Sequence, residues 1–188
     1  MSAFEFVTVF FSVVLGMSVG QLMTAIADLI EHRHRVRSYW VQVVWVVTLL
    51  LMQAQAWWGL WDLRGVSEWN IVGFMLIVIY MAAIYLLTRL ALPRPNGATE
   101  RIDLRVHYYN VHRYFFAIVL VTSLLAVLLN TAMFNTGFLN PIQFVPYVFI
   151  VIAGIAAWTR HPAYHGAVAL FFLVAFGVFI VLDGVAIR

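Results

Sequence analysis

Six long stretches of the chain are almost entirely apolar, and short polar segments separate them. A helix needs about 20 mostly apolar residues to cross a bilayer, and each stretch has close to that length. The pattern therefore predicts an all-α, polytopic membrane helix bundle that forms a single transmembrane domain over residues 1–188. The six predicted helices are residues 4–30, 39–61, 71–92, 114–134, 141–158 and 166–187.

The first predicted helix carries a stripe of small residues at every fourth position. Residues with this spacing lie along one face of a helix. Small side chains let two membrane helices approach closely, as in Gly-x-x-x-Gly contacts. We therefore expect this face to pack against another helix and this helix to form the centre of the bundle. The stripe consists of Ser12, Gly16, Gly20 and Thr24.

The distribution of arginine predicts the orientation of the chain. All eleven basic residues are arginine, and nine of them follow the first, third and fifth predicted helices, whereas Arg64 and Arg188 lie on the other side. Cytoplasmic loops of membrane proteins carry an excess of positive charge. We therefore expect a multi-pass protein of a bacterial-type inner (plasma) membrane, with both termini on the non-cytoplasmic side.

The longest polar segment is residues 93–113, which we predict to be a cytoplasmic linker. It opens with Pro-Arg-Pro-Asn-Gly, a sequence that ends a helix and turns the chain. Apolar residues then recur at helical spacing over residues 100–113, with Thr99 available as a cap. This pattern predicts a short interfacial helix between the third and fourth membrane helices. The alternative is a linker that only sets the topology.

Composition excludes several classes of function. The chain is 64% hydrophobic and only 10% charged, against roughly 25% charged residues in soluble domains, which excludes a water-soluble fold. The net charge of +3 is spread over short linkers, so we expect no nucleic-acid partner. The absence of cysteine excludes disulfides and thiolate metal sites. The sequence implies no particular cofactor.

The polar residues inside the predicted helices are neutral. No Asp, Glu, Arg or His falls near the middle of a predicted helix, which argues against coupling to an ion gradient through a buried carboxylate. Neutral polar groups can hydrogen-bond between helices or line a narrow path for water or a small solute. The candidate lining residues are Ser18, Gln21, Thr24, Gln53 and Asn130.

All six histidines and several acids fall in or beside the linkers that we assign to the cytoplasm. His161 and His165 are four residues apart and can share a helix face, so a metal site drawn from two linkers is geometrically possible. A pH-sensing site, a contact with lipid headgroups, or residues with no shared site are the alternatives. The predicted cytoplasmic-face cluster is Asp28, Asp103, His107, His112, His161 and His165.

Three functions remain open. The first is a small oligomeric channel or facilitator for an ion or a small neutral solute, and the second is an accessory subunit of a larger membrane complex. The third is a membrane enzyme that acts on lipid through the cytoplasmic-face cluster. Because the chain has no soluble domain, we favour a non-catalytic function. The expected partners are the bilayer and either further copies of the chain or other membrane subunits.

Overall fold

The computed structural model describes residues 3–66, 69–94 and 101–186. Within these residues, six helices are long and apolar enough to cross a membrane, which indicates a multi-pass integral membrane protein. The predicted all-α bundle is thereby confirmed. The helices are α1 (Ala3–Glu31), α2 (Trp40–Gly59), α3 (Ile71–Ala91), α4 (Leu104–Phe134), α5 (Phe144–Trp158) and α6 (Pro162–Ala186).

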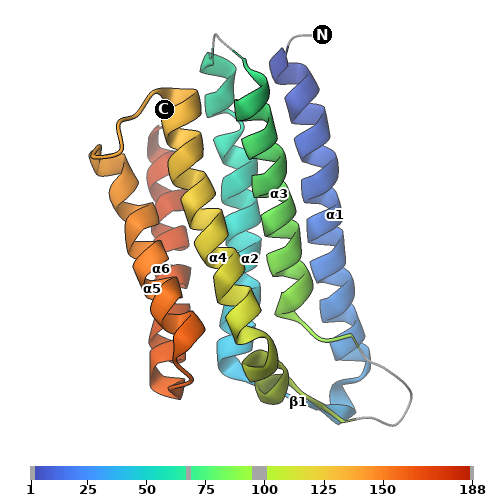
Figure 1. The fold of residues 1–188 in the computed structure, drawn as a ribbon. Helices are drawn as coiled ribbons and strands as arrows, with labels where there is room; N and C mark the ends of the chain where they lie inside the picture. The colour runs from blue at the N-terminus through green and yellow to red at the C-terminus, as the bar shows by residue number, and fades with distance from the viewer. Residues whose placement is uncertain (1–2, 67–68, 95–100, 187–188) are drawn as a thin grey trace.

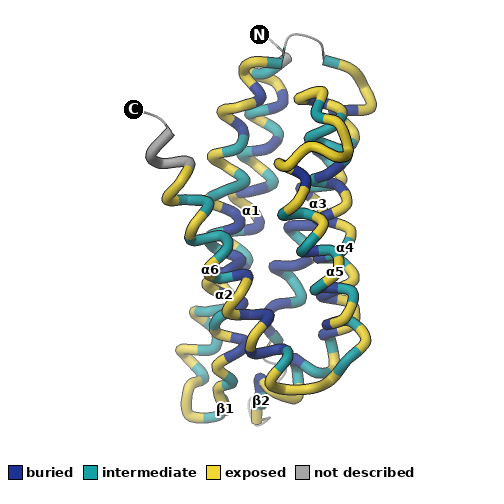
Figure 2. Tube along the Cα trace, turned by 90° about the vertical axis from the view of Figure 1, so that its left-hand side faces the viewer, coloured by how far each residue is buried: buried dark blue, intermediate teal, exposed yellow. Residues whose placement is uncertain are grey.

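The helices form two layers (Figures 1 and 2). Helices α3, α4 and α5 lie side by side in one layer, and α2 and α6 form the other. Helix α1 closes one edge and contacts α3 and α2. Contacts between the layers are fewer than contacts within them, and they are few between α2 and α4 and between α5 and α6. The backbones of the two layers therefore approach each other less closely than those of neighbouring helices within a layer.

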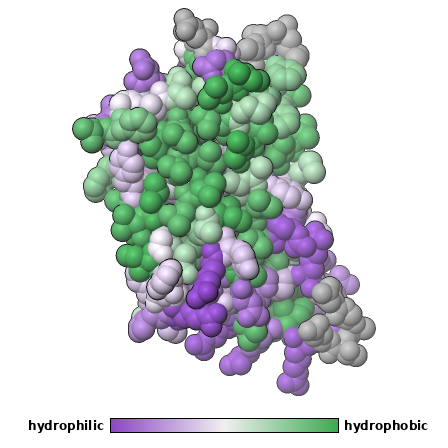
Figure 3. Space-filling view, viewed as in Figure 1, coloured by the Kyte–Doolittle hydropathy of each residue, from purple (hydrophilic) through white to green (hydrophobic). Residues whose placement is uncertain are grey.

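The two ends of the bundle differ in polarity. We call the end where α1, α3 and α5 finish the arginine end. The opposite end, which we call the tryptophan end, carries Trp57 and Trp58 in the last turn of α2 and Trp61 after it. Figure 3 shows a broad apolar surface that gives way to hydrophilic side chains at the arginine end. The assignment of the arginine end to the cytoplasm remains a prediction from the distribution of arginine.

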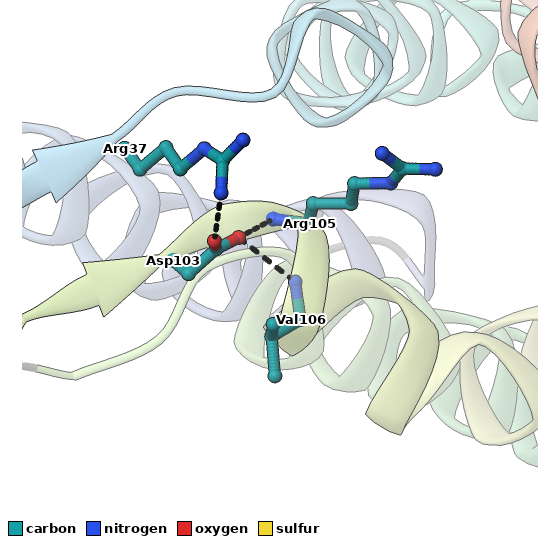
Figure 4. A network of polar contacts seen from close by, with 4 residues as sticks. All are labelled: Arg37, Asp103, Arg105 and Val106. Carbon is teal, nitrogen blue, oxygen red and sulfur yellow. Dashed lines mark hydrogen bonds and ion pairs between the residues drawn. The ribbon is translucent and has the colours of Figure 1, made fainter.

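Two short strands pair beside the arginine end. Strand β1 (Val36–Arg37) runs parallel to β2 (Ile102–Asp103), which brings the α1–α2 linker against the start of α4. The Asp103 carboxylate accepts hydrogen bonds from the backbone N–H groups of Arg105 and Val106 at 2.9 and 3.1 Å (Figure 4). Asp103 therefore caps α4, and an ion pair with the largely exposed Arg37 at 3.4 Å adds little to that role.

The predicted separate interfacial helix is wrong, because residues 104–113 form the first turns of α4. Leu104, Tyr108 and His112 are buried at intervals of four residues, and the same face continues into Phe115 and Phe116. One uninterrupted apolar face favours one uninterrupted helix. The turn predicted after Arg94 and the predicted Thr99 cap fall in residues 95–100, outside the described residues.

The start of α5 explains how Pro146 is accommodated. Residues Pro141–Gln143 form a 3₁₀ turn, which the Asn140 side chain caps by accepting a hydrogen bond from the Ile142 N–H at 3.0 Å. Helix α5 then begins at Phe144, so Pro146 lies in its first turn. Backbone N–H groups in the first turn have no acceptor within the helix, and proline therefore costs no hydrogen bond there.

Helix α1 is an edge helix and not the centre of the bundle, contrary to the sequence-based expectation. Its buried face, with Phe11, Leu15 and Leu22, joins the common core, whereas Gly16 and Gly20 are exposed. A Cβ added at either glycine would meet no atom within 4 Å. The small-residue stripe therefore has no partner helix within the described chain, and its packing role remains a prediction about a second molecule.

The contact between α2 and α6 depends on a close approach at Gly166. A Cβ added there would lie 2.9 Å from the ring of Trp40, closer than a van der Waals contact. We expect Gly166→Leu to lower the free energy of unfolding by about 1–3 kcal/mol through overpacking, as measured by unfolding in mixed micelles. Gly177→Leu on the same helix is the control, because no atom lies within 4 Å of its added Cβ. Equal losses in both variants would contradict the prediction.

Candidate functional site

A cavity of about 400 Å³ lies inside the bundle, between the two helix layers. Along α2 its wall runs from Trp45 to Gly59, about 21 Å of helix, and it ends beside Asp62 at the tryptophan end. Its volume falls within the roughly 300–1,000 Å³ typical of small-molecule sites. The apolar side chains that line it include Phe11, Leu49, Met52, Val119, Phe149 and Phe176.

A few hydroxyl groups interrupt this apolar wall. The hydroxyls of Thr48, Thr122 and Ser123 each donate to the carbonyl four residues earlier in their own helix, at 2.9, 2.8 and 2.9 Å. Their protons are thereby used, whereas each oxygen can still accept a hydrogen bond. The half of the cavity nearer the arginine end therefore offers acceptors to a ligand that carries a hydrogen-bond donor.

A polar hub near the tryptophan end ties the start of α5 to α4. The Gln143 side chain is fully buried, and its Oε1 accepts a hydrogen bond from Asn130 Nδ2 at 3.3 Å. Its Nε2 donates to the carbonyl of Val127 at 3.3 Å and to the hydroxyls of Thr131 and Thr136 at 3.3 and 3.2 Å. Asn130 also lines the cavity, so the hub holds part of the cavity wall in place.

Aromatic rings close the cavity toward the arginine end. Trp45, Phe115 and Phe172 are the lining residues nearest that end on α2, α4 and α6. The Trp45 ring lies 4.9 Å from the Phe115 ring and 5.2 Å from the Phe172 ring, between ring centroids. Rings at these distances are in direct contact. The end of the cavity that faces the arginine end of the bundle, which we call its floor, is therefore closed by these three side chains.

Two of the predicted cluster histidines lie beneath this floor. His165 is fully buried, accepts a hydrogen bond at Nδ1 from the Tyr108 hydroxyl at 2.9 Å, and donates from Nε2 to the Thr159 carbonyl at 3.0 Å. These partners assign the neutral tautomer with the proton on Nε2. The pair links α4 to the α5–α6 connection.

His112 is equally buried, and its ring centroid lies 5.7 Å from that of His165. Its Nδ1 donates to the Tyr109 carbonyl at 2.7 Å, which leaves Nε2 as a lone pair with no hydrogen-bond partner among the described residues. Sequence reasoning placed both histidines with the linkers. The structure encloses both rings between helices because they continue the buried faces of α4 and α6.

Two tyrosines extend the histidine group toward the arginine end. The Tyr39 and Tyr109 hydroxyls lie 3.4 Å apart, and the ring of Tyr39 contacts that of Tyr108 at 5.6 Å between centroids. Tyr39 precedes α2, and burial raises the pKa of its phenol above the ordinary value, with a further increase from the hydrogen bond to Tyr109. Tyr39 therefore stays protonated at physiological pH and acts as a packing and hydrogen-bonding group.

The other members of the predicted cluster lie apart. Asp103 caps α4, and His107 Nε2 lies 3.1 Å from the Leu90 carbonyl. His161 is exposed in the turn before α6, and Asp28 lines a separate pocket. In the described parts of the chain, no three His, Cys, Asp or Glu residues are placed to hold a metal ion.

The predicted lining residues are likewise divided between places. Only Asn130 lines the central cavity, whereas Gln53 is buried on another face of α2 and donates to the Leu49 carbonyl at 3.2 Å. Gln21 and Thr24 line the separate pocket, and Ser18 hydrogen-bonds Thr88 beside it. The predicted set did not include three hydroxyl residues that line the cavity, Thr48, Thr122 and Ser123. These membrane helices carry polar residues on several faces, so the sequence does not show which face points inward.

Comparison with known proteins adds no relative. No family model, curated protein or solved structure matches this chain.

Proposed function

We propose that this integral membrane protein binds a small neutral molecule in the central cavity and acts as a facilitator for that molecule. The observation that carries the proposal is the cavity of about 400 Å³, with apolar walls and acceptor oxygens in the half nearer the arginine end. The molecule that fits this lining has an apolar body and at least one hydrogen-bond donor. Of the three functions left open by the sequence, the facilitator is the one that such a cavity supports best.

The lining argues against an ion as the ligand. Among the described residues that line the cavity, Asp62, at the tryptophan end, is the one charged side chain. An ion that moved past Asp62 would meet mainly Leu, Phe, Met and Val side chains, which cannot replace its hydration shell. The packed rings of Trp45, Phe115 and Phe172 also argue against a permanently open pore. We therefore propose a facilitator whose floor must move for passage.

Filling the cavity tests the proposal. The probe is 10-bromodecan-1-ol, whose bromine quenches tryptophan fluorescence and whose hydroxyl supplies a hydrogen-bond donor. Trp45 lines the cavity and serves as the reporter, and Trp45→Phe identifies its share of the signal. We expect Ala126→Phe, on the cavity wall, to weaken the saturable quenching in nanodiscs by about tenfold or more.

Ala117→Phe is the matched control, because Ala117 is exposed on the same helix. It keeps the quenching that arises from the probe dissolved in the surrounding lipid. Saturable quenching of equal strength in Ala126→Phe and the wild type would contradict the proposal. That result would favour the second candidate, an accessory or oligomeric membrane subunit, for which the exposed Gly16 and Gly20 face of α1 is the supporting observation.

A further inference from the structure

A second pocket, of about 230 Å³, lies between α1 and the end of α3. Unlike the central cavity, it gathers charges of both signs, and it is separate from the site of the proposed function. Two guanidinium groups and one carboxylate line it, together with an amide and two hydroxyl groups. These residues are Gln21, Thr24 and Asp28 from α1, Thr88 and Arg89 from α3, and Arg94.

The pocket arises because α1 and α3 end at different heights. The buried hydroxyls of Ser18 and Thr88 lie 2.9 Å apart, which sets the two helices in register. Beyond this point α3 continues for only about 5 Å, to Ala91, whereas α1 continues for about 20 Å, to Glu31. The last turns of α1 therefore lack α3 as a neighbour, and the pocket occupies this recess.

The height of the pocket matches the lipid headgroups. The 21 residues of α3 span about 31 Å, close to the roughly 30 Å thickness of a hydrocarbon core. The end of α3, with Arg89, therefore lies at the boundary between acyl chains and headgroups. A phospholipid of the adjacent leaflet would have its phosphate at this level.

The polar groups of the pocket are not paired with one another. Asp28, Arg89 and Arg94 make no ion pair within 4.0 Å among the described residues, although all three line one recess. The Gln21 Nε2 is shielded from solvent and has no hydrogen-bond partner in the described chain. Unpaired groups of both signs fit a ligand that itself carries both signs, since two guanidinium groups bind a phosphate and a carboxylate binds an ammonium.

We propose that this pocket binds a zwitterionic phosphoethanolamine group, with the phosphate at Arg89 and Arg94 and the ammonium at Asp28. The chemistry is shared by two sources, the headgroup of phosphatidylethanolamine in the bilayer and free phosphoethanolamine in solution. An anionic headgroup without an amine would leave the Asp28 carboxylate facing a negative ligand. The pocket therefore prefers the aminophospholipid over phosphatidylglycerol.

Lipid retention by the intact protein tests this site. The protein is exchanged into mixed micelles with equal amounts of phosphatidylethanolamine, phosphatidylglycerol and phosphatidylcholine, and bound lipid is counted by native mass spectrometry. We expect Arg94→Gln, at an exposed position, and Arg89→Gln to lower retention of phosphatidylethanolamine at least about fivefold. Asp28→Asn is expected to remove the preference for phosphatidylethanolamine over phosphatidylglycerol while some phospholipid is still retained.

Arg37→Gln is the matched control, because Arg37 lies at the same end of the bundle but outside the pocket. A second arm adds phosphoethanolamine to the protein after the lipid exchange, while phosphatidylethanolamine is still bound. If free phosphoethanolamine displaces the bound phosphatidylethanolamine, the free compound is also a ligand of the pocket. If the lipid stays bound, the ligand is the headgroup of the intact lipid. Retention that is the same in Arg94→Gln, Asp28→Asn and wild type, with all three folded by circular dichroism, would overturn the proposal and leave the central cavity untouched.

Discussion

Gln143→Leu is expected to lower the free energy of unfolding by about 2–3 kcal/mol. The substitution introduces an apolar side chain of similar size and removes all four hydrogen bonds of the hub, to Asn130, Val127, Thr131 and Thr136. Hydrogen bonds between membrane helices contribute about 0.6 kcal/mol each on average, and partners left unpaired in a buried place add to the loss. The measurement is reversible unfolding in mixed micelles, followed by far-ultraviolet circular dichroism.

Tyr147→Phe gives the comparison for this prediction. It also removes a hydrogen bond from the α4–α5 connection, the 2.9 Å bond from the Tyr147 hydroxyl to the Phe138 carbonyl. That bond is exposed, so its groups regain other partners, and the expected loss is below about 0.5 kcal/mol. A Gln143→Leu protein as stable as Tyr147→Phe would show that the hub does not hold α5 against α4.

His165→Leu is expected to cost about 2–4 kcal/mol, because it leaves two buried groups without partners. The Tyr108 hydroxyl loses its acceptor at 2.9 Å, and the Thr159 carbonyl loses its donor at 3.0 Å. The first bond joins segments that are 57 residues apart in the sequence, whereas the second closes the short α5–α6 connection. Their loss should therefore loosen the contact of α4 with the start of α6, which proteolysis of the α5–α6 connection would detect.

His112→Leu is the matched variant, since both rings are fully buried and lie 5.7 Å apart. The bond that His112 makes, from Nδ1 to the Tyr109 carbonyl, is local to α4, and its Nε2 has no partner among the described residues. Its replacement is expected to cost about 1 kcal/mol or less. Tyr108→Phe combined with His165→Leu completes a double-mutant cycle. A His112 variant that is less stable than the His165 variant would contradict this account.

The position of each membrane helix could be predicted because each is encoded locally. Apolar runs of about 20 residues predicted all six helices, and most observed boundaries lie within four residues of the predicted ones. The exception is the start of α4, ten residues earlier than expected. Hydropathy alone could not reveal it, because Tyr108 and His112 are polar enough to resemble a linker although they are buried.

The candidate site could be predicted only in part. Asn130, one of the predicted lining residues, borders the cavity, but the hub around Gln143 was missed because its partners come from α4 and the connection that follows it. The small residues of α1 indicated close packing, yet Gly16 and Gly20 face away from the rest of the chain. Helix periodicity states which residues share a face and does not state which neighbour that face meets.

The sequence by itself determined that six apolar helices cross a membrane and that arginine gathers at one end, because both follow from local composition and the cost of burying unpaired backbone in lipid. The tertiary structure alone decided which polar groups meet. The sparse contact of α2 with α4 creates the cavity, and the unequal ends of α1 and α3 create the second pocket. Both depend on which helices pack against one another. The sequence does not show this, because apolar side chains cover every face of each helix and suit contact with lipid and with protein equally well.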